Sequence, residues 1–226
     1  MTKPASLPLL LVVLTVTTGL IDAVSVLGLG RVFTANMTGN VVFLGFALAG
    51  VPGFSPARSL AALAAFLAGA VIGGRLGGRL DGSRRRWLAT VAIVESSLLF
   101  AAALAALGYD SERLVPVVRL YSLIALTAVA MGLRNATVRR LAIPDLTTSV
   151  LTLTLTGLGA DSFLAGGQNP RFARRVASVV AMLAGAVVGG ILVLSVGVGW
   201  PLAASGAITL LATLTYVARP AASEDA

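Results

Sequence analysis

The sequence contains no cysteine and no histidine among its 226 residues. The absence of cysteine excludes disulfides, thiol chemistry and thiolate-ligated metals. The absence of histidine removes the commonest general base, the usual zinc ligand and the usual proton relay near neutral pH. Lysine occurs once, at Lys3, so a serine or threonine nucleophile would lack the bases that normally activate it. We therefore expect no enzyme active site, no metal centre and no cofactor.

Charged residues are also scarce, at 12% of the chain, whereas 57% of the residues are hydrophobic and the mean hydropathy is +0.95. Soluble domains usually carry about 25% charged and roughly 45–50% apolar residues. These values predict an integral membrane protein whose main partner is the lipid bilayer. The net charge of +8 does not indicate nucleic-acid binding, because the arginines cluster between apolar runs, as they do in cytoplasmic loops.

Eight apolar runs of about the length of a membrane span divide the chain. They cover residues 7–29, 33–50, 59–80, 87–108, 117–138, 147–165, 176–198 and 201–218. Polar breaks rich in proline, glycine or charge separate most of them. The expected fold is all-α: a polytopic membrane helix bundle that forms a single domain over residues 1–226. The polar tail at residues 219–226 is expected to be disordered.

An internal repeat organises the chain into halves at approximately residues 7–108 and 117–218. Residues 66–74 match residues 182–190 at seven of nine positions, with an offset of 116. Residues 19–23 align with residues 132–136 at an offset of 113, and Thr34 and Thr38 align with Thr148 and Thr152 at an offset of 114. Three matches in order favour a duplication over chance similarity between apolar helices.

The distribution of basic residues indicates how the two halves are oriented. If all eight runs cross the membrane, eight basic residues lie on one side and nine on the other, which is not the usual cytoplasmic excess. If the second run of each half enters and returns, thirteen lie inside and four, Arg31, Arg58, Arg113 and Arg119, lie outside. We therefore predict inverted halves, each with three spans and one polar re-entrant or broken helix, and cytoplasmic N- and C-termini.

A polar cluster interrupts the second apolar run between residues 31 and 40, and threonines recur in the matching run of the second half. Side chains four residues apart would share a helix face, as Thr34 with Thr38 and Asn36 with Asn40. These groups either line a path, where they replace the water around a solute, or hold helices together. We favour the path because the clusters occupy matching positions. The path candidates are Thr34, Asn36, Thr38, Gly39, Asn40, Thr148, Thr152 and Thr156.

Two acidic residues lie inside apolar runs, where a carboxylate is costly unless it meets protein or water. Asp22 aligns with Asn135 of the second half, and it serves either a cation or proton site or a structural cap for Arg31 or a helix end. Glu95 serves either as a proton carrier or in a structural ion pair with Arg119 or Arg134. Catalysis by these two carboxylates is a weaker interpretation.

Small residues at four-residue spacing mark one helix face in each half. Gly69, Gly73 and Gly77 form the first face, and Gly185 and Gly189 form the second. Such faces allow helix backbones to approach closely in membranes. We expect the two related helices to pack together at the axis that relates the halves.

Residues 19–23, 31–40, 131–136 and 147–152 resemble the YoaK-like family of bacterial membrane proteins, a domain-of-unknown-function family with about six spans. The resemblance covers nearly the whole chain, and the stretch at residues 36–40 is its most specific part. It implies a location in the bacterial cytoplasmic membrane and a transport role, and it implies no substrate.

Together these features predict a transporter or channel for a small solute or ion, with its path lined by the polar clusters and its charge handled by Asp22 and Glu95. The alternative is a membrane scaffold or sensor in which the same residues only pack. The sequence leaves open which solute is carried and whether the chain forms a homo-oligomer.

Overall fold

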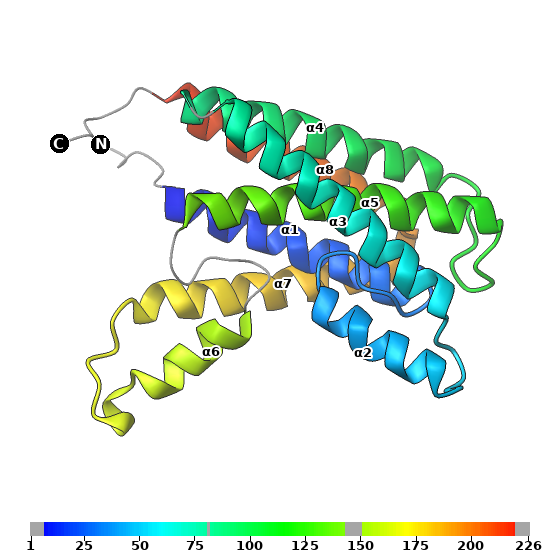
Figure 1. Cartoon of the computed structure of the whole chain (residues 1–226), viewed down its shortest axis with the longest axis horizontal. Coiled ribbons are helices and arrows are strands. Elements are labelled where there is room, and N and C mark those ends of the chain that lie inside the picture. The colour runs from blue at the N-terminus through cyan, green and yellow to red at the C-terminus, as the bar shows by residue number, and fades with distance from the viewer. Residues whose placement is uncertain (1–6, 81, 143–150, 220–226) are drawn as a thin grey trace.

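The computed structural model describes residues 7–80, 82–142 and 151–219, and the regular elements in these ranges are helices. Six of them are long and apolar enough to cross a membrane, in agreement with the predicted all-α membrane bundle (Figure 1). They are α1 (Leu7–Gly28), α3 (Pro56–Arg79), α4 (Arg84–Ala105), α5 (Val117–Leu141), α7 (Phe172–Val196) and α8 (Gly199–Ala218).

Two further helices are too short to span a bilayer. α2 (Met37–Leu48) has 12 residues and α6 (Leu151–Ala160) has 10, and a 3₁₀ turn, η1 (Phe163–Ala165), follows α6. At 1.5 Å per residue these helices are about 18 and 15 Å long, against a hydrocarbon core of about 30 Å. They lie in the second and sixth apolar runs of the sequence, which are the two runs predicted not to cross the membrane.

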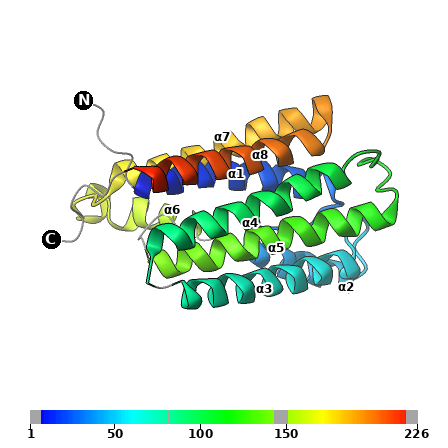
Figure 2. The same ribbon diagram turned by 90° about the horizontal axis from the view of Figure 1, so that it is seen from above.

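The long helices pack in pairs that are not neighbours in the sequence. α1 lies along α7, and α3 lies along α5. α4 contacts α5 and α8, and α8 also contacts α1, so these helices close the bundle (Figure 2). α2 rests on α3 and α6 rests on α7, outside the main bundle (Figure 1).

Glycines set the closest of these helix crossings. A Cβ on Gly69 would overlap the carbonyl oxygen of Val129 in α5, and one on Gly185 would overlap that of Val16 in α1. The glycine faces of α3 and α7 therefore pack against α5 and α1, and α3 and α7 do not contact each other. The expectation that these two helices pack together is wrong, because the backbones of α5 and α1 already occupy the close approach that the two glycine faces allow.

Capping residues explain where several helices begin. The Ser55 side chain accepts a hydrogen bond from the Arg58 N–H, and Pro56 occupies the first turn of α3. Ser83 accepts from the Arg86 N–H at the start of α4 in the same way. These hydroxyls satisfy N–H groups that have no partner within the helix.

The helix ends fall into two groups at opposite ends of the bundle. The start of α1, the end of α3, the start of α4, the start of α7 and the end of α8 lie at one end, on the left in Figure 1. The passage from α4 to α5 and the passage from α7 to α8 lie at the other end. Successive long helices therefore run in opposite directions.

Candidate functional site

The polar cluster forms a bent entry into α2 rather than a continuous helix. After α1 the backbone turns through Gly30 and Arg31, which have φ angles of 77° and 59°. α2 begins only at Met37, where the Asn36 side chain accepts a hydrogen bond of 3.3 Å from the Gly39 N–H. Thr34 and Asn36 thus precede the helix. The expected stacking of Thr34 on Thr38 and of Asn36 on Asn40 along one helix face does not occur, because Asn36 caps the N-terminus of α2 and the residues before it are not helical.

Asn40 and Thr34 are buried within this bend. The Asn40 side chain accepts from the Phe33 N–H at 2.8 Å and donates back to the Phe33 carbonyl. It therefore fixes the extended segment before α2. Thr34 is fully buried, and its hydroxyl has no hydrogen-bond partner. Neither residue lines a cavity described below.

A cavity of about 470 Å³, here called the acidic cavity, lies beside the beginning of α2. It combines polar groups from three helices that are distant in sequence. Its lining consists of Thr18, Asp22, Ala35, Asn36, Thr38, Gly39, Val42, Phe43, Leu151, Thr152, Leu155 and Met182. The structure thus brings Asp22, Asn36, Thr38, Gly39 and Thr152 of the predicted path together.

Of the described residues that line this cavity, Asp22 alone carries a charged side chain. Only 8% of the residue is exposed, and its Oδ1 atom has no hydrogen-bond partner. The backbone N–H of Ala35 donates to the carboxylate. Asp22 therefore stabilises the segment that leads into α2 with part of its hydrogen-bonding capacity, and its buried Oδ1 atom remains unsatisfied.

A second cavity of about 840 Å³, here called the basic cavity, lies on the other side of residues 35–38. It shares Ala35, Asn36 and Thr38 with the acidic cavity. Its lining is Ala35, Asn36, Met37, Thr38, Phe66, Ala70, Gly74, Asn135, Ala136, Val138, Arg139 and Arg140. Asn135, the counterpart of Asp22, donates to the Met131 carbonyl at 2.8 Å, so an amide takes the place of the carboxylate on this side.

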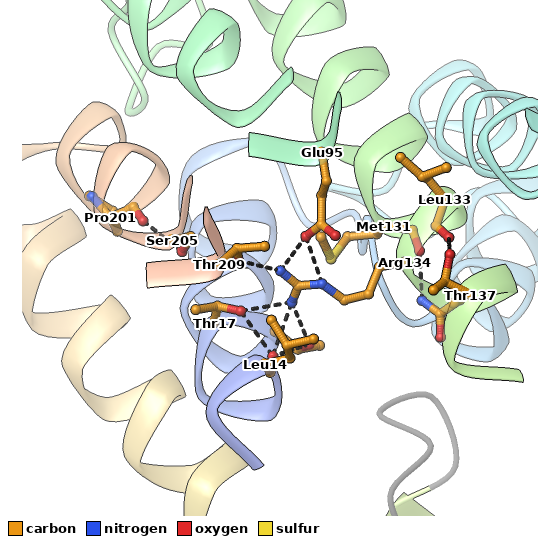
Figure 3. Close-up of polar contacts among 12 residues, drawn as sticks. Leu14, Thr17, Glu95, Met131, Leu133, Arg134, Thr137, Pro201, Ser205 and Thr209 are labelled. Carbon is orange, nitrogen blue, oxygen red and sulfur yellow. Dashed lines mark hydrogen bonds and ion pairs between the residues drawn. The ribbon is translucent and has the colours of Figure 1, made fainter. Parts of the chain in front are cut away.

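Glu95 lies away from both cavities, in a buried ion pair with Arg134 (Figure 3). Arg134 Nε donates to Glu95 Oε1 at 2.7 Å. The guanidinium also donates to the Leu14 carbonyl and to the hydroxyls of Thr17, Thr18 and Thr209. This Arg134 centre joins α1, α4, α5 and α8, and of the two partners considered for Glu95 the structure selects Arg134 rather than Arg119.

Of the two path threonines in α6, only one lines the acidic cavity. Thr152 lines the acidic cavity, whereas Thr156 is exposed and donates to the Thr152 carbonyl at 2.9 Å. Thr148 lies outside the described residues. A contact that sequence reasoning missed holds this helix: Arg175 of α7 donates to the Gly157 carbonyl at 2.6 Å and pairs with Asp161 at 2.7 Å. In the sequence, this contact was indicated only by an acid, Asp161, and an arginine, Arg175, on either side of the same loop.

A cluster of aromatic rings beside the acidic cavity was also missed. Phe43, which lines the cavity, stacks on Phe33 at 5.4 Å between ring centroids and contacts Phe54 at 5.0 Å. The Arg31 guanidinium lies 5.7 Å above the Phe54 ring, so Arg31 is held by aromatic contact. In the described ranges, no three acidic side chains come close enough to form a metal site.

The sequence of this chain is similar to a protein family and to a curated membrane protein. A family model described as "Protein of unknown function (DUF1275)" matches residues 10–215. A curated protein of Bacillus subtilis (strain 168), the UPF0700 transmembrane protein YoaK, is 33% identical over 162 residues, which cover 71% of this chain and 69% of that protein. No solved structure matches.

Proposed function

We propose a transport function for this chain, which belongs to the DUF1275 family of proteins of unknown function. In this proposal the chain is a multi-pass membrane protein that carries a small solute or ion and performs no catalysis. The observation that carries the proposal is that Asn36 and Thr38 line both the acidic and the basic cavity. Non-helical backbone and short helices at membrane depth are tolerated where they line a water-filled cavity.

The proposal includes two inverted halves, of which α2 and α6 are the re-entrant helices. Matching contacts support this arrangement. A Cβ on Gly19 in α1 would overlap the carbonyl oxygen of Met182 in α7, and one on Gly132 in α5 would overlap that of Phe66 in α3. Both pairs occupy equivalent positions in the sequence repeat. With three long helices in each half, the second half must start from the opposite side of the membrane.

The distribution of positive charge supports cytoplasmic termini in a bacterial inner membrane. Arg134 is buried inside the bundle, so we do not count it among the basic residues that flank the spans. In the predicted topology, the remaining sixteen divide into twelve on the side of the termini and four on the other side. An excess of this kind marks the cytoplasmic face of membrane proteins.

The path is formed by neutral polar groups rather than by a wide pore. Thr38 and Thr152 come from α2 and α6 and both line the acidic cavity. Their hydroxyls can replace part of the water shell of a passing solute, as polar lining groups do in selective channels. Asn36 lies between the two cavities, and therefore controls the passage from one to the other.

Flux into liposomes that contain the purified protein tests this function. We expect Thr38→Val and Thr152→Val to reduce solute or ion flux at unchanged protein content, because each removes a hydroxyl from the path and keeps the side-chain volume. Thr215→Val is the matched control, since Thr215 is exposed on α8 and only donates to carbonyls of its own helix. Flux that survives both path substitutions would defeat the path assignment.

The second candidate function is a membrane scaffold or sensor. The Asn40 contact with Phe33 and the Arg134 centre favour it, because in both cases polar groups at membrane depth serve packing. A protein that is stable in liposomes and transports none of a broad set of ions and small solutes would support this alternative.

A further inference from the structure

Among the described residues, the acidic cavity is lined by one buried acid and by no basic side chain. Resting on the proposed transport function, we infer that this cavity binds a monovalent cation, either an alkali ion or the ammonium group of a small solute, at the carboxylate of Asp22. Asp22 lines the cavity with 8% of its surface exposed, the Ala35 N–H donates to its carboxylate, and the buried Oδ1 atom has no hydrogen-bond partner. A buried carboxylate without a partner is costly, and a cation from solution removes that cost.

The charge balance at the cavity favours a cation over an anion. The beginning of α2 contributes a positive end equivalent to roughly half an elementary charge. Asp22 contributes one negative charge when it is ionised, so the local sum is then negative by about half a charge. The cap at Asn36 already accepts from the Gly39 N–H, which further reduces the attraction of this helix end for an anion.

Arg134 does not neutralise Asp22, although Thr18 connects the two regions. Thr18 lines the acidic cavity and accepts from Arg134 at 3.0 Å. The remaining donors of the guanidinium are engaged by Glu95, Leu14, Thr17 and Thr209. The arginine charge is balanced by Glu95, and so the Arg134 centre as a whole is neutral toward the cavity.

The remaining lining supplies neutral oxygen atoms that suit a cation released from water. Thr38 and Thr152 contribute hydroxyls from two different helices, and Asn36 contributes an amide. Oxygen donors of this kind, together with a carboxylate, are the ligands that hard cations prefer.

The basic cavity provides an internal comparison. It has Asn135 where the acidic cavity has Asp22, and it is lined by Arg139 and Arg140. A cation is therefore expected on one side of Asn36 only. This asymmetry gives the two openings of the proposed path different charge preferences.

Cation-dependent thermal stability of the purified protein tests the inference. We compare lithium, sodium, potassium, ammonium and methylammonium chlorides with N-methylglucamine chloride at equal ionic strength. At least one small cation is expected to raise the Tm in a saturable manner, because a ligand of the folded state stabilises it by mass action. A response to alkali ions identifies an ion site, and a response confined to ammonium and methylammonium identifies an amine-bearing solute. Equal Tm values in all salts would overturn the inference.

Asp22→Asn should abolish this cation effect, whereas Glu112→Gln should retain it. Glu112 is an exposed acid in the α4–α5 loop, so its substitution removes the same charge without touching the cavity. A folded Asp22→Asn protein with the wild-type cation response would contradict the assignment to Asp22.

A second measurement uses the wild-type chain and does not depend on how the variant folds. Dicyclohexylcarbodiimide modifies buried carboxyl groups, and mass spectrometry of the peptide that contains Asp22 gives the rate. The stabilising cation should slow the modification of Asp22 several-fold, and N-methylglucamine should not. An unchanged rate would overturn the inference. Flux without any cation effect leaves the proposed function standing alone, whereas cation binding without flux of any solute defeats only the transport function.

Discussion

The Arg134 side chain of α5 and the Glu95 side chain of α4 form an ion pair that is almost completely shielded from solvent. Arg134 also reaches three groups on α1 and one on α8. Its guanidinium therefore ties together four of the long helices (Figure 3). In the proposed repeat, Arg134 corresponds to the buried apolar residue Ile21, so that position forms no second centre of this kind among the described residues.

Removing one partner of this pair should destabilise the bundle strongly. Glu95→Gln leaves the Arg134 charge buried without compensation, which typically costs about 3–5 kcal/mol. Glu95→Leu combined with Arg134→Met removes both charges, and we expect it to lose less stability than Glu95→Gln alone. Thermal unfolding in detergent micelles measures the losses, with Glu112→Gln as the surface control. Strictly additive losses in the corresponding double-mutant cycle would contradict a coupled pair.

This pair also illustrates what the sequence could provide. Hydropathy identified the long helices with boundaries within a few residues, because lipid demands continuous apolar runs. The sequence also showed that Glu95 needs a partner at membrane depth. It left the choice between Arg119 and Arg134 open, since Glu95 and Arg134 are 39 positions apart and meet only when α4 packs on α5.

The polar cluster was predicted as a functional region, but its internal geometry was not. Periodicity treats residues 33–50 as one helix, whereas the helix begins at Met37. Asn36 accepts a hydrogen bond from the Gly39 N–H, and Asn40 accepts one from the Phe33 N–H. Two of the expected path residues therefore also stabilise the local backbone. Local competition between side-chain and backbone hydrogen bonds decides this, and a helical repeat does not reveal it.

Alanine substitutions at the close helix crossings should be equally costly in the two halves. A Cβ on Gly19 or Gly132 would overlap backbone atoms of the helix opposite, so Gly19→Ala and Gly132→Ala force the helices apart. Overpacking of this kind usually costs about 1–3 kcal/mol. Gly74→Ala is the control, since nothing lies within 4 Å of the added carbon. A lower Tm for one half only would contradict equivalent crossings.

Tyr109, in the loop that follows α4, should ionise at unusually high pH. Burial raises the pKa of Tyr109 from 10.0 to about 12, although the charge of Arg58 opposes the shift. Its hydroxyl donates to the Gly28 carbonyl at 2.8 Å, which requires the protonated form. The folded-state pKa exceeds the unfolded one, so this contribution to stability is complete below pH 10 and is lost as the pH rises toward 12.

Absorbance of tyrosinate during alkaline titration measures this pKa. The difference between wild type and Tyr109→Phe isolates one of the three tyrosines and should show a midpoint near pH 12. Tyr109→Phe should also lower stability at neutral pH by roughly 0.5–1.5 kcal/mol, the usual net value of a hydrogen bond. A midpoint near pH 10 for that difference would contradict the buried phenol.

Single cysteines introduced into the cysteine-free chain should report the inverted halves directly. Ser55 caps the start of α3, and Gln168 precedes α7, so each lies just before the third helix of its half (counting the short one). In parallel halves these equivalent positions would share a side of the membrane, and in inverted halves they cannot. We expect a membrane-impermeant maleimide to label Ser55→Cys from outside and Gln168→Cys from inside.

Two further positions make the labelling experiment decisive. Glu112→Cys, in the α4–α5 loop, should be labelled from the same side as Ser55→Cys. Ser83→Cys, before α4, should be labelled from the same side as Gln168→Cys. These pairs follow from the grouping of the helix ends at the two ends of the bundle (Figure 1). The native chain is the blank, since it has no thiol to react. Labelling of Ser55→Cys and Gln168→Cys from the same side would remove the basis for inversion. In that case α2 and α6 could not approach the path from opposite faces, and the shared lining by Thr38 and Thr152 would lose its role in transport.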